Sequence, residues 1–286
     1  MGTRYQKLAS GSTKSHKFAL LKGMRKILII ILFLVTGLFL KGQSLEVGFL
    51  GGTSYYLGDL NPGYHFLQPK PAYGALVRFN PNTRWAFKLN GYRGKVFGSD
   101  AASNRNENRQ LSFESVILDI SAVAEFNFFD YFTGSKKNNW SPFIFGGIGF
   151  FTFNPKAGDV ELASLGTEGQ NIGFGGREPY NKWSIAIPFG VGFKFSLNSR
   201  ISAAFEWGLR KTFTDYIDDV STTYYLEGAE IDPGNTAELL SDPTMLHEPY
   251  QERGNPETTD WYSFAGITLT YKFDLFGNRG CPDQRR

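Results

Sequence analysis

Apolar side chains recur at every second position in the segment from residue 182 to residue 197. The run reads Trp183, Ile185, Ile187, Phe189, Val191, Phe193, Phe195 and Leu197, with Ser, Ala, Pro, Gly and Lys between them. A period of two over this length predicts a β-strand with one apolar face. The other face carries small residues and a lysine, which suits the polar interior of a membrane barrel.

The same alternation returns along the chain after residue 43. It marks eight segments, at 45–57, 71–80, 84–97, 111–128, 141–153, 182–197, 200–213 and 260–274. Each is near or above the roughly 9–11 residues that a tilted membrane strand needs. The connections after the second and sixth segments are short, and those after the first, third, fifth and seventh are long. This pattern predicts an all-β fold, an eight-stranded antiparallel up-and-down transmembrane β-barrel.

The first 43 residues have a different character. Arg25 and Lys26 precede an uncharged apolar run at 27–40, and small or polar residues follow it, which is the layout of a secretory signal peptide. The run falls short of the roughly 20 residues of a spanning helix, which is the weaker alternative. Met24 is an alternative start. We expect three parts: a cleaved N-terminal extension and signal peptide at 1–43, the barrel at 44–276, and a periplasmic tail at 277–286.

The position of the termini sets the orientation. With the N-terminus in the periplasm, the short turns are periplasmic and the long loops, at 58–70, 98–110, 154–181 and 214–259, are extracellular. Trp85 and Trp140 then begin strands at the periplasmic end, whereas Trp183 and Trp261 begin strands at the opposite end. Tryptophans at both ends predict two aromatic girdles in contact with lipid. The expected location is the outer membrane of a Gram-negative cell, with both termini periplasmic and outer-membrane lipids as partners.

A soluble, lipocalin-like barrel is the structural alternative, because it also has alternating strands and an export signal. Its larger side chains would point inward. Here one strand face often carries Gly, Ser, Ala or charged residues, which would leave a soluble core underfilled. The membrane barrel is therefore favoured.

Charged residues fall on the face that should point into the barrel. Their number is small and their signs nearly balance, with four acids and five bases: Glu46, Arg78, Lys88, Asp119, Glu125, Lys194, Glu206, Arg210 and Lys272. An eight-stranded barrel is narrow enough to be filled by its own side chains. We therefore expect ion pairs that fill the lumen, with a proton or solute path as the alternative.

The formal charge of +3 gives little support for nucleic-acid binding. Eight of the 30 Lys and Arg residues, and none of the 27 acidic residues, lie in residues 1–43. The remainder is acidic and lacks the basic stripe that nucleic-acid binding needs. The single Cys281 cannot close an intrachain disulfide, although it could crosslink to a partner in the oxidising periplasm.

Signals for catalysis or metal binding are weak. His65 and His247 lie in long loops, and the chain has no G-x-S-x-G motif, so we expect no catalytic residues and no cofactor. A cluster of acids in the last loop lacks the regular spacing of a calcium loop. We expect these side chains to be solvated rather than to hold a metal: Asp215, Asp218, Asp219, Glu227, Glu230 and Asp232.

Several runs carry a resemblance to a known family. They are SYYLGDLNP at 54–62, FIFGGIG at 143–149, RKTFTDYIDDVSTTYY at 210–225 and the GCP of the tail at 280–282. In these runs the chain resembles the PorG family, outer-membrane β-barrels of the type IX secretion system of Bacteroidetes. The resemblance implies a structural or accessory role, in which the barrel ties the periplasmic PorK/PorN ring to the outer membrane.

The candidate docking surface is periplasmic. It comprises Lys136 and Lys137, in the connection at 130–139, and the segment 278–286 with Cys281. Two other functions stay open. A general small barrel for adhesion or envelope integrity would act through its extracellular loops, and an outer-membrane lipid-modifying enzyme would depend on His65 or His247.

Overall fold

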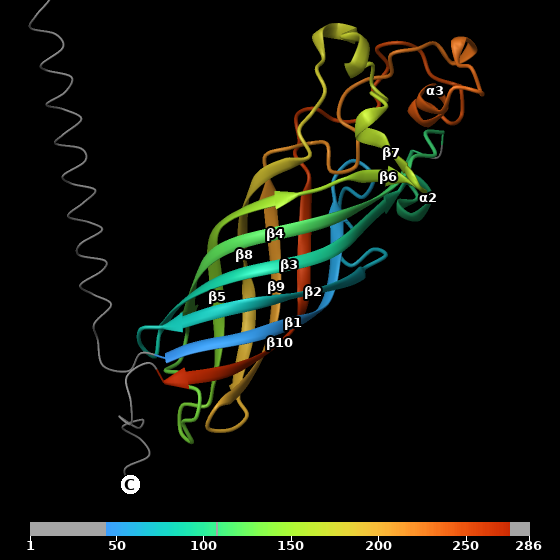
Figure 1. The fold of residues 1–286 in the computed structure, drawn as a ribbon. Helices are drawn as coiled ribbons and strands as arrows, with labels where there is room; N and C mark the ends of the chain where they lie inside the picture. Colours follow the sequence, from blue (N-terminus) through green and yellow to red (C-terminus); the bar gives the residue numbers. More distant parts are fainter. Residues whose placement is uncertain (1–43, 107, 275–286) are drawn as a thin grey trace, which may run out of the picture. The chain divides into compact units, whose positions relative to one another are not determined.

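The computed structural model of the protein describes residues 44–106 and 108–274. These residues form a closed antiparallel sheet (Figure 1). Around the barrel the strands follow the order β3-β2-β1-β10-β9-β8-β5-β4, and pairing of β3 with β4 closes the ring. The eight strands are β1 (Ser44–Leu57), β2 (Lys70–Asn80), β3 (Trp85–Ser99), β4 (Ser112–Asn127), β5 (Trp140–Thr152), β8 (Trp183–Ser196), β9 (Ile201–Thr212) and β10 (Trp261–Asp274). The prediction of an eight-stranded antiparallel up-and-down barrel is confirmed.

Two short strands were not predicted. β6 (Pro155–Ala157) pairs with β4 beyond the end of β5, and β7 (Val160–Glu161) pairs with β6, so the whole sheet has ten strands. Strands of three and two residues are too short for a period of two to appear in the sequence. They extend one wall of the barrel into the loop that follows β5.

The barrel exterior is apolar and the interior polar. Phe49, Ile148 and Ile267 face outward with 72%, 62% and 58% of their surface exposed, while the charged positions of the alternating pattern are buried inside. A soluble protein rarely exposes an apolar surface that surrounds the whole molecule, because its contact with water is unfavourable. The soluble-barrel alternative requires the reverse arrangement. The barrel therefore spans a membrane, as the strand pattern predicts.

Both ends of the described chain lie at one end of the barrel. Ser44, at the start of β1, pairs with Asp274, at the end of β10, and with Asn80, at the end of β2. The two short turns, at 81–84 and 197–200, lie at this end. The expected leader at 1–43, the tail at 277–286 and Cys281 lie outside the described residues.

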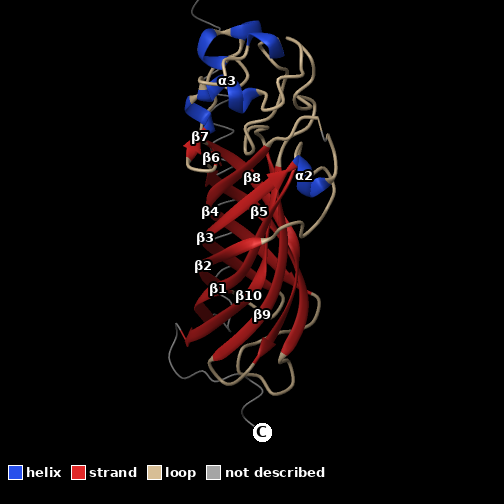
Figure 2. Cartoon of the chain, turned by 90° about the vertical axis from the view of Figure 1, so that its right-hand side faces the viewer, coloured by secondary structure: helices blue, strands red, loops and turns tan. Residues whose placement is uncertain are grey.

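The long loops gather at the other end, where Figure 2 shows the helices grouped beyond the strands. We call residues 100–110, 154–181 and 214–259 the cap. Within the described part of the chain, no helix has the length and apolar character needed to cross a bilayer. The cap contains α2 (Asp100–Ser103), α3 (Thr236–Ser241) and four 3-10 turns, η2 (Leu162–Ser164), η3 (Gln170–Ile172), η4 (Phe174–Gly176) and η5 (Gly228–Glu230).

Candidate functional site

Arg78 lies inside the lumen, two residues from the end of β2, and joins three walls of the barrel. Its Nη1 is 3.0 Å from Glu46 Oε2, its Nε is 3.0 Å from Glu125 Oε2, and its Nη2 is 3.2 Å from Glu206 Oε1. These carboxylates come from β1, β4 and β9. A buried charge needs partners to offset its lost hydration, and the guanidinium has donors enough for all three.

Two lysines complete a balanced cluster around Arg78. Lys88 Nζ lies 2.6 Å from Glu206 Oε2 and 3.0 Å from Glu125 Oε1, and Lys194 Nζ lies 2.7 Å from Glu125 Oε2. Three bases and three acids thus pair inside the barrel. We call them the central cluster: Glu46, Arg78, Lys88, Glu125, Lys194 and Glu206.

The other three inward charges lie apart from this cluster. Arg210 Nε is 3.7 Å from Asp119 Oδ2, and Tyr262 donates a 2.8 Å hydrogen bond to the same oxygen. Lys272 lies 3.5 Å from Asp274 and donates to the Thr133 carbonyl at 2.9 Å. Lys272 therefore pairs with an acid outside the nine residues that the sequence singles out.

The connection between β4 and β5, at residues 128–139, folds into the open end of the barrel, and we call it the plug hairpin. Tyr131, Thr133 and Ser135 are buried. Thr133 Oγ1 donates a 2.6 Å hydrogen bond to Glu46 Oε1 of the central cluster. The hairpin therefore closes the lumen from the end that holds the chain termini. Lys136 and Lys137 remain exposed at its tip.

Four tryptophans lie on the outer wall near the strand ends. Trp85 packs against Phe126, and Trp140 stacks against Phe193 at 5.4 Å between ring centroids. Both begin strands at the end that holds the termini, whereas Trp183 and Trp261 begin strands at the cap end. Trp85, Trp140 and Trp183 are exposed and Trp261 is half-buried, so the four rings occupy the positions of two interfacial girdles.

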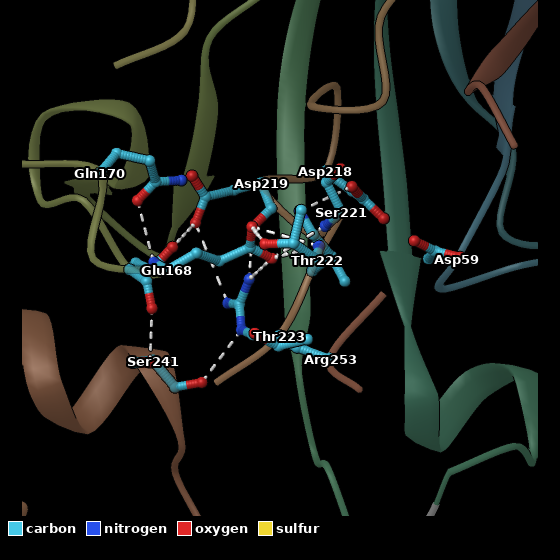
Figure 3. A network of polar contacts seen from close by, with 12 residues as sticks. Asp59, Glu168, Gln170, Asp218, Asp219, Ser221, Thr222, Thr223, Ser241 and Arg253 are labelled. Atoms are coloured by element: carbon cyan, nitrogen blue, oxygen red, sulfur yellow. Dashed lines mark hydrogen bonds and ion pairs between the residues drawn. The ribbon is translucent and has the colours of Figure 1, made fainter. Parts of the chain in front are cut away.

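The cap is held together by the buried ion pair of Glu168 and Arg253 (Figure 3). Arg253 Nη1 is 3.1 Å from Glu168 Oε1, and its Nε donates to the Ser241 carbonyl at 3.1 Å. Glu168 also accepts hydrogen bonds from the backbone N–H groups of Ser221, at 2.9 Å, and Thr222, at 3.0 Å. This network joins the loop after β5 to the loop after β9.

A second polar group fixes the loop after β3. Arg109 Nε donates to Asp100 Oδ2 at 2.9 Å, and Arg109 Nη2 donates to Asp100 Oδ1 at 2.6 Å. The guanidinium also donates to the carbonyls of Asp59 and Arg253. Four loops are thus tied to one another by buried arginines, because the loops that follow β1 and β9 meet the loop after β3 here.

Buried carboxyl groups lie where the cap meets the lumen. The hydroxyl of Tyr56 is 2.6 Å from Asp218 Oδ2 and 2.8 Å from Asp260 Oδ1. A hydroxyl has one hydrogen, so the second contact requires a protonated carboxyl. Burial raises the pKa of Asp218 and of Asp260 well above the usual value, and it raises the pKa of Asp215 to about 9.

The prediction that the acids of this loop are solvated is wrong for part of the set. Asp218 and Asp219 are fully buried, and Asp219 accepts a hydrogen bond from Tyr180 at 2.5 Å. Glu227, Glu230 and Asp232 are exposed. In residues 44–106 and 108–274, no group of three or more His, Cys, Asp and Glu side chains is placed to hold a metal ion.

The two loop histidines hold local structure. His65 Nδ1 lies 3.0 Å from the Tyr55 hydroxyl. His247 stacks on Tyr224 at 4.1 Å between ring centroids, and its Nδ1 lies 2.9 Å from Asp242 Oδ1. These contacts explain the positions of both imidazole rings, which pack within their own loops.

A polar cavity of about 600 Å³ opens beside the cap network. Three loops line it, those after β1, β3 and β9. Asp59, Arg109, His247 and Arg253 are among the lining residues, and the two arginines are those already paired with buried acids. The cavity is therefore part of the cap and not of the lumen.

Sequence reasoning missed the residues that organise the cap, above all Glu168 and Arg253. A signal was present for one of them. Arg253 is the only Lys or Arg residue between positions 214 and 259, in a loop rich in acids. A single base in such a loop has many acids available as partners. Glu168 lies in a loop without periodicity, and no comparable signal marks it.

Residues 25–226 match the family model described as "Domain of unknown function (DUF6089)". No curated protein sequence matches the chain.

Among solved structures, the chain is similar to the N-terminal β-barrel domain of OprF from Pseudomonas aeruginosa, at 10% identity and a TM-score of 0.37, covering 80% of this chain and 97% of that one. It is also similar to Neisserial surface protein A, at 8% identity and a TM-score of 0.40, covering 82% and 98%. A third is the attachment invasion locus protein Ail of Yersinia pestis, at 9% identity and a TM-score of 0.38, covering 82% and 100%.

Proposed function

This chain belongs to the DUF6089 family, and we propose that it is a structural barrel of the outer membrane that conducts no solute and anchors a periplasmic assembly. The observation that carries the proposal is the position of Arg78. One guanidinium bound to carboxylates of three different strands obstructs the lumen near the end that holds the chain termini. A solute could pass only if the ion pairs of this buried cluster separated. Their separation would leave uncompensated charges inside the barrel, which is strongly unfavourable.

The two ends of the lumen support the same role. The plug hairpin enters one end through Thr133, and the cap covers the other through Tyr56 and its two carboxyl partners. Both ends are closed by side chains that are themselves hydrogen-bonded. Such a barrel is rigid along its length, which suits an anchor better than a gate.

The assembly that we propose as partner is the type IX secretion machinery. The supporting observation is the resemblance of the runs at 54–62, 143–149 and 210–225 to the PorG family. In this proposal the end that carries the termini faces the periplasm. Lys136 and Lys137 at the tip of the plug hairpin, together with the tail beyond residue 277, contact the PorK/PorN-like ring.

The test is export of a type IX cargo from a strain that lacks this chain. Loss of export, restored by the wild-type chain, is the expected result. Recovery of the ring with outer-membrane fractions should fall in the same strain. Normal export together with normal ring attachment would refute the proposal.

A second candidate function is a general small barrel that acts outside the cell. The buried Glu168–Arg253 pair favours it, because a cap ordered by internal ion pairs presents a fixed surface. Under this alternative, deletion leaves cargo export intact and changes adhesion or envelope integrity. The same deletion strain therefore separates the two functions.

A further inference from the structure

Tyr55 is the one residue of its strand face that contradicts the barrel pattern. Its neighbours Ser54 and Tyr56 point into the lumen, so Tyr55 points outward toward lipid. Nevertheless, none of its surface is exposed. Some part of the chain must therefore cover the outer wall at this point.

The cover is the loop between β1 and β2. His65 Nδ1 and Trp207 Nε1 lie 3.0 Å and 2.9 Å from the Tyr55 hydroxyl, and the rings of Phe66 and Tyr55 are 4.7 Å apart. The ring of His65 also contacts Trp207 edge-on at 5.8 Å. Trp207 belongs to β9, so the loop crosses the outer wall over β1, β10 and β9.

The loop is held in this position by the side chain of Asn61 and by its own backbone conformation. Asn61 donates from Nδ2 to the carbonyls of Tyr56, at 2.8 Å, and Tyr64, at 2.9 Å. Phe66 and Gln68 adopt left-handed backbone angles, with φ of 60° and 45°. We call residues 62–69 the wall loop.

The composition of the wall loop differs from that of the cap. Between Asp59 and Lys70 the chain has no Asp, Glu, Lys or Arg residue. Tyr64 and Phe66 nevertheless expose 52% and 47% of their surface. Exposed aromatic side chains in an uncharged loop are unfavourable in water and favourable at a membrane interface.

The depth of the wall loop can be read from the strand register. Trp207 pairs with Ala265, four residues along β10 from Trp261 of the cap-end girdle. At about 3.4 Å per residue and a tilt of about 45°, Trp207 lies roughly 10 Å below that girdle. The loop that packs on Trp207 therefore reaches the level of the lipid, where it is continuous with the apolar exterior of the barrel.

We propose that the wall loop is an interfacial anchor, which inserts Tyr64 and Phe66 into the outer leaflet at the boundary between headgroups and acyl chains. Its partner is the lipid surface. The Tyr55 hydroxyl, His65 Nδ1 and Trp207 Nε1, which this placement would otherwise expose to lipid, bind one another. The anchor fixes the height of β1, β9 and β10 in the membrane, independently of the partner on the periplasmic side.

The proposal can be tested with spin labels in vesicles of phosphatidylcholine and phosphatidylglycerol. Cys281→Ser gives a background without cysteine. Labels are then attached through Tyr64→Cys and, separately, Gly63→Cys, where a Cβ meets no atom within 4 Å. Ile267→Cys on the lipid-facing wall is the lipid reference. Tyr250→Cys, a cap tyrosine with 68% of its surface exposed, is the matched aqueous control.

Collision of each label with oxygen, which enters lipid, and with a nickel chelate, which stays in water, gives its depth. The expected oxygen-to-nickel ratio at Tyr64 is several-fold above that at Tyr250 and below that at Ile267, with Gly63 between Tyr64 and Tyr250. Heat-modifiable migration in gels verifies that each barrel is folded. Labels at Tyr64 and Gly63 that behave like the one at Tyr250 would overturn the proposal. Labels shielded from both reagents would overturn it as well, because they would indicate a protein contact.

Discussion

The hydroxyl of Tyr56 joins the cap to the barrel by two hydrogen bonds, one of which requires a protonated carboxyl group. It lies between Asp218 and Asp260, and only one of these two carboxyl groups can accept its hydrogen at a time. The other carboxyl must carry a proton of its own. Because burial raises the pKa of both acids, this proton is retained at pH values where an exposed aspartic acid is ionised.

The stability of the cap should therefore fall as the pH rises. The pKa of these acids is higher in the folded cap than in the unfolded loop, where it is about 4. At pH values above about 4 the folded cap therefore binds more protons than the unfolded loop, and its stability falls as the pH rises. The loss of stability continues until the pH exceeds the pKa of the folded state, which is about 9 for Asp215. Hydrogen exchange of residues 214–259, corrected for intrinsic rates, should show less protection at about pH 8.5 than at about pH 5.5.

Asp218→Asn should reduce this pH dependence. The amide nitrogen can donate to the Tyr56 oxygen without a titrating proton, and the phenol can then donate to Asp260. The difference in protection between the two pH values should be smaller in the variant than in the wild type. An equal loss of protection in both proteins would show that Asp218 and Asp260 do not cause the pH dependence.

Arg253→Gln should open the cap while the barrel stays folded. It leaves the carboxylate of Glu168 buried without its cation, which destabilises a structure by about 3–5 kcal/mol. The variant should be cleaved by protease within 154–181 and 214–259 much faster than the wild type. Arg105→Gln, at an exposed arginine of the same cap, is the matched control and should change little.

Lumen charges and cap charges differ in how far the sequence reveals them. The nine inward charges follow from strand parity, because a period of two assigns each residue to one face. The Glu168–Arg253 pair joins loops 85 positions apart, and loops have no period that relates such positions. Strand parity does place Asp274 on the same face as Lys272, so this pair was predictable from the sequence.

At the level of elements, the strands were predictable to within two residues at each end. Long alternating runs specify their own register, since a slip of one residue would turn the charged positions toward lipid. β6 and β7 were not predictable, because their pairing depends on where the loop after β5 lies. The position of the plug hairpin inside the barrel also depends on distant residues, above all Glu46.

The plug hairpin has two surfaces with different roles. Tyr131 and Thr133 face the lumen, whereas Lys136 and Lys137 are exposed. Charge reversal at the exposed pair, Lys136→Glu with Lys137→Glu, should weaken ring binding about tenfold or more by introducing like-charge or unpaired contacts. The barrel should remain folded, because neither lysine takes part in the lumen network.

Pull-down of the ring by tagged barrel measures this effect. Lys211→Glu is the control, since Lys211 is exposed at the cap end of β9. It should leave ring recovery unchanged. Undiminished recovery with the double variant would rule out the tip of the plug hairpin as the docking surface.

At the scale of the whole molecule, three layers of polar contacts lie along the barrel. The plug hairpin closes one end, the central cluster fills the lumen next to it, and the buried carboxyl groups under the cap close the other end. The apolar exterior keeps the barrel in the membrane, and these three layers separate its two sides. We therefore propose that the barrel is an anchor and conducts no solute.

Single-channel recording of the purified protein in a planar lipid bilayer tests this claim most directly. The wild-type barrel, inserted in a bilayer with about 1 M salt on both sides to suppress surface-charge effects, should give a flat current at all moderate voltages. Insertion is verified independently by protease protection of the strands. Stable unitary current steps from the wild-type protein would contradict the account.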